Sequence, residues 1–283
     1  MGILAALLSA FTSTAKDLVS KLLAGRVHPD VSTFASFFFA LPFYLVVMAI
    51  AIASGQETLR VTGAFLGLVL IRGISDVCAE GCKMRALAYG DVSLVTGLLA
   101  LSPLLLTVLS PVITGDPVSL KEGAAIGLVV LGGLLLIRRD RRAGGIVQPI
   151  AVLYAVGGSL AFALNSCFDR LAVEHGGPFL SAFAMTVCAS ALTAPFVVRR
   201  KGVVSEMRFN IRAFLLRGLF ETIFMVAKMI ALVTLPAHIV VGIMRMSMLL
   251  TVVVGGAMFK EEDRARRIIA SAIMCVGLVL LVM

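Results

Sequence analysis

The chain has 283 residues, of which 60% are hydrophobic and 14% are charged, and its mean hydropathy is +1.05. This composition leaves too little polar surface to cover a water-soluble globule of that size, so we predict an all-α integral membrane protein. The formal net charge of +9 would suit nucleic acid, but the basic residues cluster in short breaks between apolar runs. Lysine and arginine orient membrane helices at such breaks, so we expect a lipid bilayer around the chain and no nucleic-acid partner.

Ten apolar stretches are each long enough to cross a bilayer as a helix, which takes roughly 20 residues. The breaks between them fall at glycine, proline and charged residues. The first stretch has no basic region before it, so we interpret it as a retained helix and not as a signal peptide. The predicted helices cover residues 2–24, 31–54, 62–86, 91–113, 119–137, 148–172, 178–198, 211–233, 236–258 and 264–282.

The basic residues are unevenly shared between the breaks, and most follow the odd-numbered predicted helices. They are Arg26, Arg85, Arg138, Arg139, Arg141, Arg142, Arg199, Arg200, Lys201, Arg208, Arg212, Lys260, Arg264, Arg266 and Arg267. By the positive-inside rule these breaks are cytoplasmic, which with ten helices places both termini outside. We therefore predict a multi-pass protein of the plasma membrane, the inner membrane of a bacterium.

One ionisable pattern occurs in each half of the chain: an arginine, a glycine, an acid four residues after the arginine, and a later lysine. Its members are Arg72, Gly73, Asp76 and Lys83 in the first half and Arg217, Gly218, Glu221 and Lys228 in the second. We infer a duplication that divides the chain into residues 1–142 and 143–283, with five helices in each part. Because five is odd, the second part enters the membrane in the opposite sense, which gives inverted repeats around a central cavity.

Further segments repeat between the two halves. They are residues 86–103, 114–119 and 123–133 in the first half and residues 231–247, 259–262 and Gly277 in the second. In these segments the chain resembles the drug/metabolite transporter superfamily, in its ten-helix EamA-type branch. The resemblance implies a bundle of two inverted five-helix halves with a central cavity, which exports or exchanges small metabolites without ATP.

The chain departs from the family pattern in two respects. The family has Gly-Glu before the fifth and tenth helices, whereas this chain has Gly115-Asp116 in one copy and Lys260-Glu261, without the glycine, in the other. The Arg-Gly-x-x-acid pairs also make the helices more charged than the family pattern. We therefore expect a polar solute and not a hydrophobic drug, although the resemblance does not select which solute.

The third predicted helix carries a charged stripe, because Arg72, Asp76, Glu80 and Lys83 follow one another at intervals of four and three residues. Such a stripe either neutralises itself and stabilises helix packing or lines a cavity that binds a charged solute or protons. Ionisable groups inside membranes usually face a pathway, which favours the cavity. The matching helix has Met225 where Glu80 would be repeated.

Arg245 lies near the middle of the ninth predicted helix, and its counterpart in the first half is Ala100. It has no acid within one helical turn. Two interpretations stay open: pairing with Glu221 or Asp76 from another helix, or binding of an anionic ligand. In the first helix, Lys16-Asp17 likewise fits either a cap near the membrane interface or a role in the cavity.

Basic residues outnumber acids in these segments, and an anionic or zwitterionic solute fits that balance. The residues assigned to solute binding are Arg72, Lys83, Arg217, Lys228, Arg245, Ser102 and Asn165. Those assigned to proton or ion coupling are Asp17, Asp76, Glu80 and Glu221. Gly63-x-x-x-Gly67 and Gly123-x-x-x-Gly127 allow close helix approach, and we expect them to pack within the chain.

The leading hypothesis is a secondary transporter or exporter of a small polar metabolite, working by alternating access with proton coupling or exchange. The sequence contains no nucleotide-hydrolysis, nucleophile or dinucleotide motif, and Cys78 and Cys82 lack the second ligand pair of a zinc site. We therefore expect no enzyme, cofactor or metal. An intramembrane enzyme acting on a lipid-linked phosphate is the alternative, and an ungated pore is a third. Monomer and homodimer both stay open.

Overall fold

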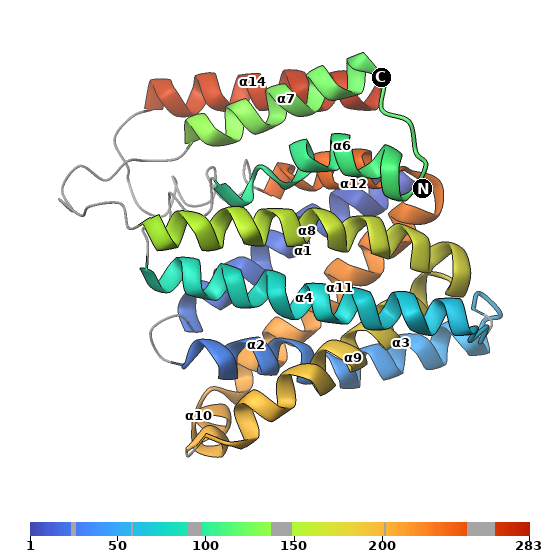
Figure 1. The fold of residues 1–283 in the computed structure, drawn as a ribbon, viewed down its shortest axis with the longest axis vertical. Coiled ribbons are helices and arrows are strands. Elements are labelled where there is room, and N and C mark those ends of the chain that lie inside the picture. Colours follow the sequence, from blue (N-terminus) through green and yellow to red (C-terminus); the bar gives the residue numbers. More distant parts are fainter. Residues whose placement is uncertain (24–26, 58, 90–97, 137–148, 201, 248–263) are drawn as a thin grey trace.

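The computed structural model describes residues 1–23, 27–57, 59–89, 98–136, 149–200, 202–247 and 264–283. Helices account for the regular structure of these ranges, and they run alongside one another as a bundle (Figure 1). The helices before residue 137 are α1 (Gly2–Leu23), α2 (Pro29–Phe38), α3 (Leu41–Ala53), α4 (Gly63–Tyr89), α6 (Ser102–Ile113) and α7 (Leu120–Leu136). Those after residue 148 are α8 (Pro149–Gly176), α9 (Pro178–Val198), α10 (Val203–Phe209), α11 (Ile211–Thr234), α12 (Ala237–Met244) and α14 (Arg264–Val282).

The predicted all-helical architecture is confirmed, but the elements do not correspond one to one with the ten predicted helices. Seven predicted helices agree with single helices to within a few residues: α1, α4, α7, α8, α9, α11 and α14. The predictions for residues 91–113 and 236–258 extend into residues that lie outside the described ranges, and α6 and α12 lie within their described parts, residues 98–113 and 236–247.

The second predicted helix, residues 31–54, is interrupted at Phe39 and Ala40, between α2 and α3. Pro42 stands in the first turn of α3 and explains the interruption. Proline has no N–H to donate, and its ring clashes with the carbonyl group four residues earlier if the helix continues. The Ala40 N–H instead bonds the carbonyl oxygen of Phe37 at 3.2 Å, a tighter turn than an α-helix makes.

The short helix α10 was not predicted, because its segment is rich in charged and polar residues and follows a basic cluster. Gly202 precedes α10 with a φ of +85°, a left-handed conformation that glycine adopts without steric cost. This turn lets the chain leave α9 and begin a new helix at once. The basic break after the seventh predicted helix is therefore partly helical.

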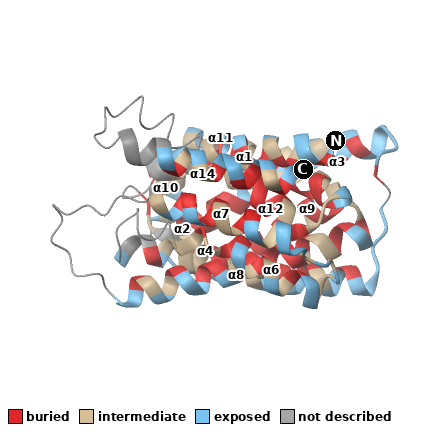
Figure 2. Cartoon of the chain, turned by 90° about the horizontal axis from the view of Figure 1, so that it is seen from above, coloured by how far each residue is buried: buried red, intermediate tan, exposed pale blue. Residues whose placement is uncertain are grey.

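The three most extensive helix pairs of the bundle are α4 with α8, α7 with α14, and α1 with α11. In Figure 1, α7 and α14 lie at one side of the bundle, α2, α3 and α9 lie at the opposite side, and α1, α4, α8 and α11 lie between them. Buried residues follow the inner faces of these helices (Figure 2). The main apolar core includes Tyr44 of α3, Phe65 of α4, Leu106 of α6 and Met229 of α11.

Glycine allows α7 and α14 to approach closely. A Cβ at Gly132 would lie 2.7 Å from the Ala270 carbonyl oxygen, and a Cβ at Gly277 would lie 2.7 Å from that of Ala125. The two glycine pairs predicted from the sequence make no such close contact. A Cβ at any of their four positions would meet no described atom within 4 Å, so they do not pack against the described chain as expected. These positions are Gly63, Gly67, Gly123 and Gly127.

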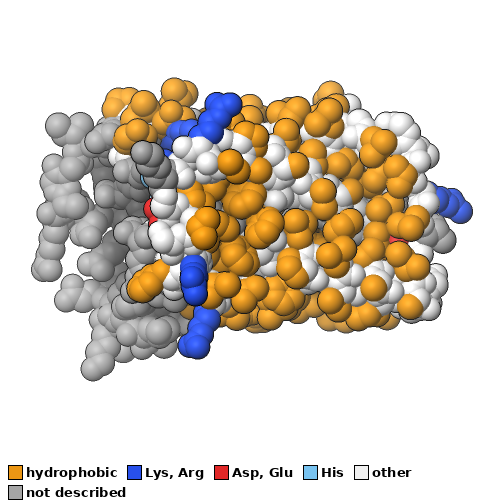
Figure 3. Space-filling model, turned by 90° about the horizontal axis from the view of Figure 1, so that it is seen from below, with side chains coloured by type: hydrophobic (Ala, Val, Ile, Leu, Met, Phe, Trp, Pro, Cys, Tyr) orange, Lys and Arg blue, Asp and Glu red, His pale blue; other side chains and the backbone are white. Residues whose placement is uncertain are grey.

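Within the described ranges, four helical segments combine the length and apolar character of a membrane span: Gly2–Ser20, Asp30–Ala53, Pro149–Gly176 and Pro178–Val198. The helices α4 and α11, which carry the repeated charges, are not among them. On the face shown in Figure 3, hydrophobic side chains cover the middle of the molecule and lysine and arginine side chains lie toward its ends. That distribution suits a protein surrounded by lipid.

Glu57, which precedes α4, caps the start of α9. Its Oε2 accepts hydrogen bonds from the backbone N–H groups of Phe179, at 2.9 Å, and Leu180, at 3.4 Å. The preceding Gly177 has a φ of +79°, and a Cβ there would overlap the Glu57 carboxylate. A carboxylate at a helix N-terminus satisfies unpaired N–H groups and favours the helix dipole.

Glu57→Ala should lower the free energy of unfolding by about 1–2 kcal/mol, because α9 loses its capping acceptor. The control is Glu174→Ala, since the Glu174 side chain is 45% exposed and its ion pair in the described structure is with Arg170 of the same helix. The chain has no tryptophan, so unfolding in SDS is best followed by circular dichroism. Equal losses in the two variants would contradict the capping role.

Candidate functional site

One buried carboxylate joins three helices. Oδ1 of Asp169, in α8, accepts a hydrogen bond from Nε of Arg72, in α4, at 2.7 Å. Its Oδ2 lies 2.6 Å from Nζ of Lys228, in α11. Asp169 is fully buried, so its charge is balanced by these two cations and not by solvent.

Three further polar side chains extend this arrangement. Nη1 of Arg72 lies 2.6 Å from Oδ2 of Asp76, and the Asn165 amide donates to Asp76 Oδ1 at 3.0 Å. The Lys228 ammonium also donates to the Ser166 hydroxyl at 3.1 Å. We call this set the Asp169 cluster. Its members are Arg72, Asp76, Asn165, Ser166, Asp169 and Lys228.

A second ion pair joins α1 to α11. Nζ of Lys16 lies 3.0 Å from Oε2 of Glu221 and 4.0 Å from the centre of the Phe224 ring, a cation–π distance. Lys16 is 7% exposed, so its ammonium lies inside the bundle. The side chain of Asp17, its predicted coupling neighbour, lies outside the described part of the structure.

Glu80 and Lys83 form a weaker pair within α4. Oε1 of Glu80 lies 3.6 Å from Nζ of Lys83, and Glu80 is 8% exposed. Lys16 and Arg217 also lie close enough to attract the charge of Glu80. The charged stripe predicted for this helix therefore divides. Its first part, Arg72 with Asp76, belongs to the Asp169 cluster, and its second part, Glu80 with Lys83, lies near Lys16 of α1 and Arg217 of α11.

The two halves make matching contacts at their repeated acids. Asp76 of α4 contacts Asn165 of α8, and Glu221 of α11 contacts Lys16 of α1. Asp76 and Glu221 occupy the same place in the Arg-Gly-x-x-acid pattern. The acid at this position therefore contacts a side chain of a neighbouring helix in both copies of the pattern. The contacting group is an amide for Asp76 and an ammonium for Glu221.

The repeated arginines differ in their partners. Arg217 is 1% exposed, and its Nη1 donates to the Ser32 carbonyl oxygen at 2.9 Å and to the Ser36 hydroxyl, both in α2. Its Nε has no hydrogen bond, and no carboxylate of the described chain lies within ion-pair distance. Arg72 meets two carboxylates where Arg217 meets a hydroxyl and a carbonyl group. Within the described chain, Arg217 is therefore a buried cation with no carboxylate at ion-pair distance.

Arg245 contacts one of the predicted polar residues. Its Nη2 donates to the Leu99 carbonyl oxygen at 3.3 Å and to the Ser102 hydroxyl at the start of α6. Of its two predicted carboxylate partners, Asp76 lies beside Arg72, and Glu221 lies beside Lys16. Arg245 and Ser102 thus link α12 to α6 at a separate place from the Asp169 cluster.

Sequence reasoning missed Asp169, which is the centre of the cluster. The residue is followed by Arg170, and an acid beside a base late in a helix resembles an interfacial pair. A usable signal was present: Asp169 lies four residues after Asn165, on the same helix face, and the predicted excess of cations called for another acid.

Arg170 itself ties α8 to other elements near the ends of the helices. Its Nη1 donates to the Leu232 carbonyl oxygen of α11, and its Nε lies 3.5 Å from Oδ2 of Asp116, which precedes α7. Its Nη2 lies 3.3 Å from Oε1 of Glu174. These are contacts of a helix end, outside the Asp169 cluster.

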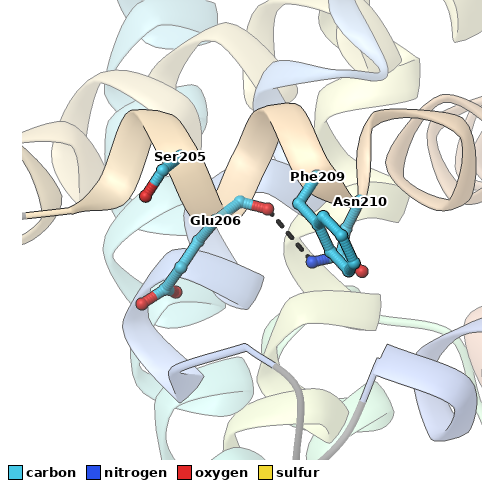
Figure 4. Close-up of a pocket in the computed structure, with 4 residues that line it drawn as sticks. All are labelled: Ser205, Glu206, Phe209 and Asn210. Atoms are coloured by element: carbon cyan, nitrogen blue, oxygen red, sulfur yellow. Dashed lines mark hydrogen bonds between the residues drawn. The ribbon is translucent and has the colours of Figure 1, made fainter.

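A surface pocket lies at α10 and does not overlap the charged clusters. Ser205, Glu206, Phe209 and Asn210 line it (Figure 4). The Asn210 amide donates to the Glu206 carbonyl oxygen at 3.0 Å, which is a bond within the helix end. None of the predicted site residues lines this pocket, so the Asp169 cluster is the candidate site.

Comparison with known proteins identifies the family. The model of the EamA-like transporter family matches residues 1–138 and 149–283. The chain is a member of the EamA-like transporter family. This family is a domain family of the drug/metabolite transporter superfamily. EamA-like family membership and the apolar helices together indicate a multi-pass membrane protein.

The fold of this EamA-like chain is also found in a solved structure titled only as the crystal structure of a protein. The two match with a TM-score of 0.77 over 99% of this chain and 95% of the other, at 17% sequence identity. At that identity the likeness concerns the fold alone. A comparison with curated proteins gives no match.

Proposed function

We propose that this protein is a secondary transporter or exporter that carries a small anionic or zwitterionic metabolite by alternating access. The observation that carries the proposal is the buried Asp169 cluster, in which ionisable side chains of α4, α8 and α11 meet. Ionisable groups inside membranes are costly and usually serve a pathway or a ligand. Membership of a family of small-molecule transporters supplies the class of function.

The charge balance supports an anionic group on the solute. Among the ionisable residues of the Asp169 cluster, the Lys16–Glu221 and Glu80–Lys83 pairs, Arg217 and Arg245, six are basic and four are acidic. The basic residues are Lys16, Arg72, Lys83, Arg217, Lys228 and Arg245, and the acidic residues are Asp76, Glu80, Asp169 and Glu221. A carboxylate or phosphate would reduce that excess, most directly near Arg217, which has no carboxylate partner in the described chain.

We further propose that the chain consists of two inverted five-helix repeats with ten spans. The matching contacts of Asp76 and Glu221 support this arrangement, as do the two segments matched by the family model. Both termini lie at the same end of the bundle (Figures 1 and 2), which supports an even number of spans. Inverted repeats of this kind alternate access by moving one half against the other around a central site.

The proposed setting is the inner membrane of a bacterium, with the termini outside and the basic breaks in the cytoplasm. The positive-inside rule supports this orientation. In the proposed cycle, solute binds to the basic residues, while Asp76, Glu80 and Glu221 exchange protons or a second ion. The solute itself is best found by thermal-shift screening of amino acids, nucleotides and organic acids, since a bound ligand stabilises the fold.

Glu221→Gln and Asp76→Asn should each lower solute-dependent proton flux in proteoliposomes by roughly tenfold or more, about 1.4 kcal/mol of coupling. Both substitutions keep the size of the side chain but remove its charge. Glu174→Gln, at an exposed carboxylate of α8, is the control and should transport normally. Undiminished transport and proton flux in both variants would refute the coupling role.

Product formation in detergent, without a membrane compartment, would favour the enzyme instead, and flux without saturation would favour a pore.

A further inference from the structure

We propose that Asp169 is an internal counter-ion that occupies an anion site formed by Arg72 and Lys228, and that the anionic group of the solute replaces it there. The ligand class is a carboxylate or a phosphate oxyanion. The statement that this ligand is the transported solute rests on the proposed transport function. The anion site itself can be tested without transport.

The geometry is that of a bound carboxylate. The two oxygens of Asp169 are divided between two cations, with Oδ1 at 2.7 Å from the Arg72 guanidinium and Oδ2 at 2.6 Å from the Lys228 ammonium. Arg72 is 5% exposed and Lys228 is 6% exposed, so water screens neither attraction strongly. A guanidinium and an ammonium so placed would hold the oxygens of a free carboxylate in the same way.

Polar atoms remain available beside this site. Within the described structure, Oδ1 of Asn165 is buried and makes no hydrogen bond, and the Ser166 hydroxyl lies 3.1 Å from Lys228. A solute with a hydrogen-bond donor near its anionic group would satisfy the Asn165 oxygen. These atoms explain why a small polar anion would fit here better than a simple halide ion.

Exchange of one anion for another is energetically reasonable. A buried ion pair contributes little net stability, because desolvation offsets much of its attraction, whereas a buried cation left without its partner is strongly destabilising. A solute anion that replaces Asp169 restores both ion pairs of the cations, and the exchange costs little when the freed Asp169 carboxylate takes up a proton or reaches water. In the absence of solute, the Asp169 carboxylate keeps the two cations neutralised.

The described part of the chain holds one such site, and the other half does not repeat it. The position that matches Asp169 in the first half is Ser20, and Arg217, the counterpart of Arg72, bonds Ser32 and Ser36 instead of a carboxylate. Asp169 also ties α4, from the first proposed repeat, to α11, from the second. A solute that displaces Asp169 would itself contact both Arg72 and Lys228. Solute binding would then depend on the relative position of the two halves.

The first test is chemical rescue of Asp169→Ala, with acetate and inorganic phosphate as probes. We expect acetate to raise the unfolding temperature of this variant well above that in chloride at equal ionic strength, while neutral acetamide has no such effect. Wild-type protein should respond little, because its own carboxylate fills the site. The matched control is Asp116→Ala, whose carboxylate lies 3.5 Å from Arg170 and is 17% exposed. Stabilisation by phosphate instead of acetate would assign the site to phosphate.

The proposal would be overturned if both anions stabilised the two variants equally, or if they stabilised neither variant. It would also be overturned if Asp169→Ala failed to fold even in acetate or phosphate. The second test uses Asp169→Asn, which keeps the side-chain volume and removes the charge. It should bind the solute found by screening roughly tenfold more tightly than wild type, because the internal competitor is weakened. Unchanged or weaker binding would refute the solute exchange. If no solute is transported, the proposed function fails, while the rescue experiment still decides whether the anion site exists.

Discussion

Arg72→Met should lower the free energy of unfolding by about 3–5 kcal/mol, the cost of removing one partner from a buried ion pair. Arg72 serves two carboxylates at once, Asp169 at 2.7 Å and Asp76 at 2.6 Å, through different nitrogens. Methionine fills much of the same volume but balances neither charge. Asp76 would keep only the Asn165 amide, and Asp169 would keep only Lys228.

The matched control is Arg85→Met on the same helix. Arg85 is exposed and makes only a 3.4 Å hydrogen bond to the Gly81 carbonyl oxygen among its described hydrogen bonds, so its loss should change stability by less than about 0.5 kcal/mol. Arg72→Lys should fall between the two, because one ammonium cannot replace two separate guanidinium nitrogens. Unfolding in SDS, followed by circular dichroism, measures all three. Losses of similar size at Arg72 and Arg85 would show that the Asp169 cluster does not stabilise the fold.

Gly218→Ala should destabilise the protein by roughly 1–3 kcal/mol, the cost of overpacking a close contact. A Cβ at Gly218 would lie 2.6 Å from the Phe39 carbonyl carbon and 2.9 Å from the Ala40 nitrogen. These are backbone atoms of the break between α2 and α3, and they cannot rotate away as the end of a side chain can. The hydroxyl of Thr222, one turn further along α11, bonds the Ala40 carbonyl oxygen at 3.3 Å and fixes the same segment.

Gly67→Ala is the control for this prediction and should have the opposite sign. A Cβ there would meet no described atom within 4 Å, so the higher helix propensity of alanine should stabilise α4 by roughly 0.5–1 kcal/mol. Gly73→Ala, the repeat counterpart of Gly218→Ala, should cost less than Gly218→Ala. Its Cβ would meet the Cys188 side chain, 2.6 Å from Sγ, and that side chain can adjust. Destabilisation of equal size at Gly67 and Gly218 would contradict the packing explanation.

The sequence predicted most helix ends well because proline and charge mark them. Pro149 and Pro178 each begin a helix at or next to the predicted residue. The break before Pro42 was missed because the residues on both sides are apolar and suggest one continuous span. The helix α10 was missed for the opposite reason, since its segment has little apolar periodicity to set it apart from a basic loop.

Local spacing predicted part of the candidate site. Arg72 and Asp76 are four residues apart in one helix, and their ion pair follows from helix geometry. The contact between Arg72 and Asp169 spans 97 residues, and no periodicity within either helix says which faces will meet. The same holds for Lys16 and Glu221. The charges could be found in the sequence, but their partners depend on how α4, α8, α1 and α11 pack.

The unequal partners of Arg72 and Arg217 have a consequence for the energies of the transport cycle. In the proposed inverted repeat, two identical halves would give inward-open and outward-open forms of equal free energy. One arginine here meets carboxylates and the other meets a serine hydroxyl and a carbonyl group, so the two forms are inequivalent. A difference of about 1.4 kcal/mol already corresponds to a tenfold ratio of populations. Without solute, the carrier should therefore be found mainly in the form that opens to one side of the membrane. Conversion into that form should be faster than the reverse conversion.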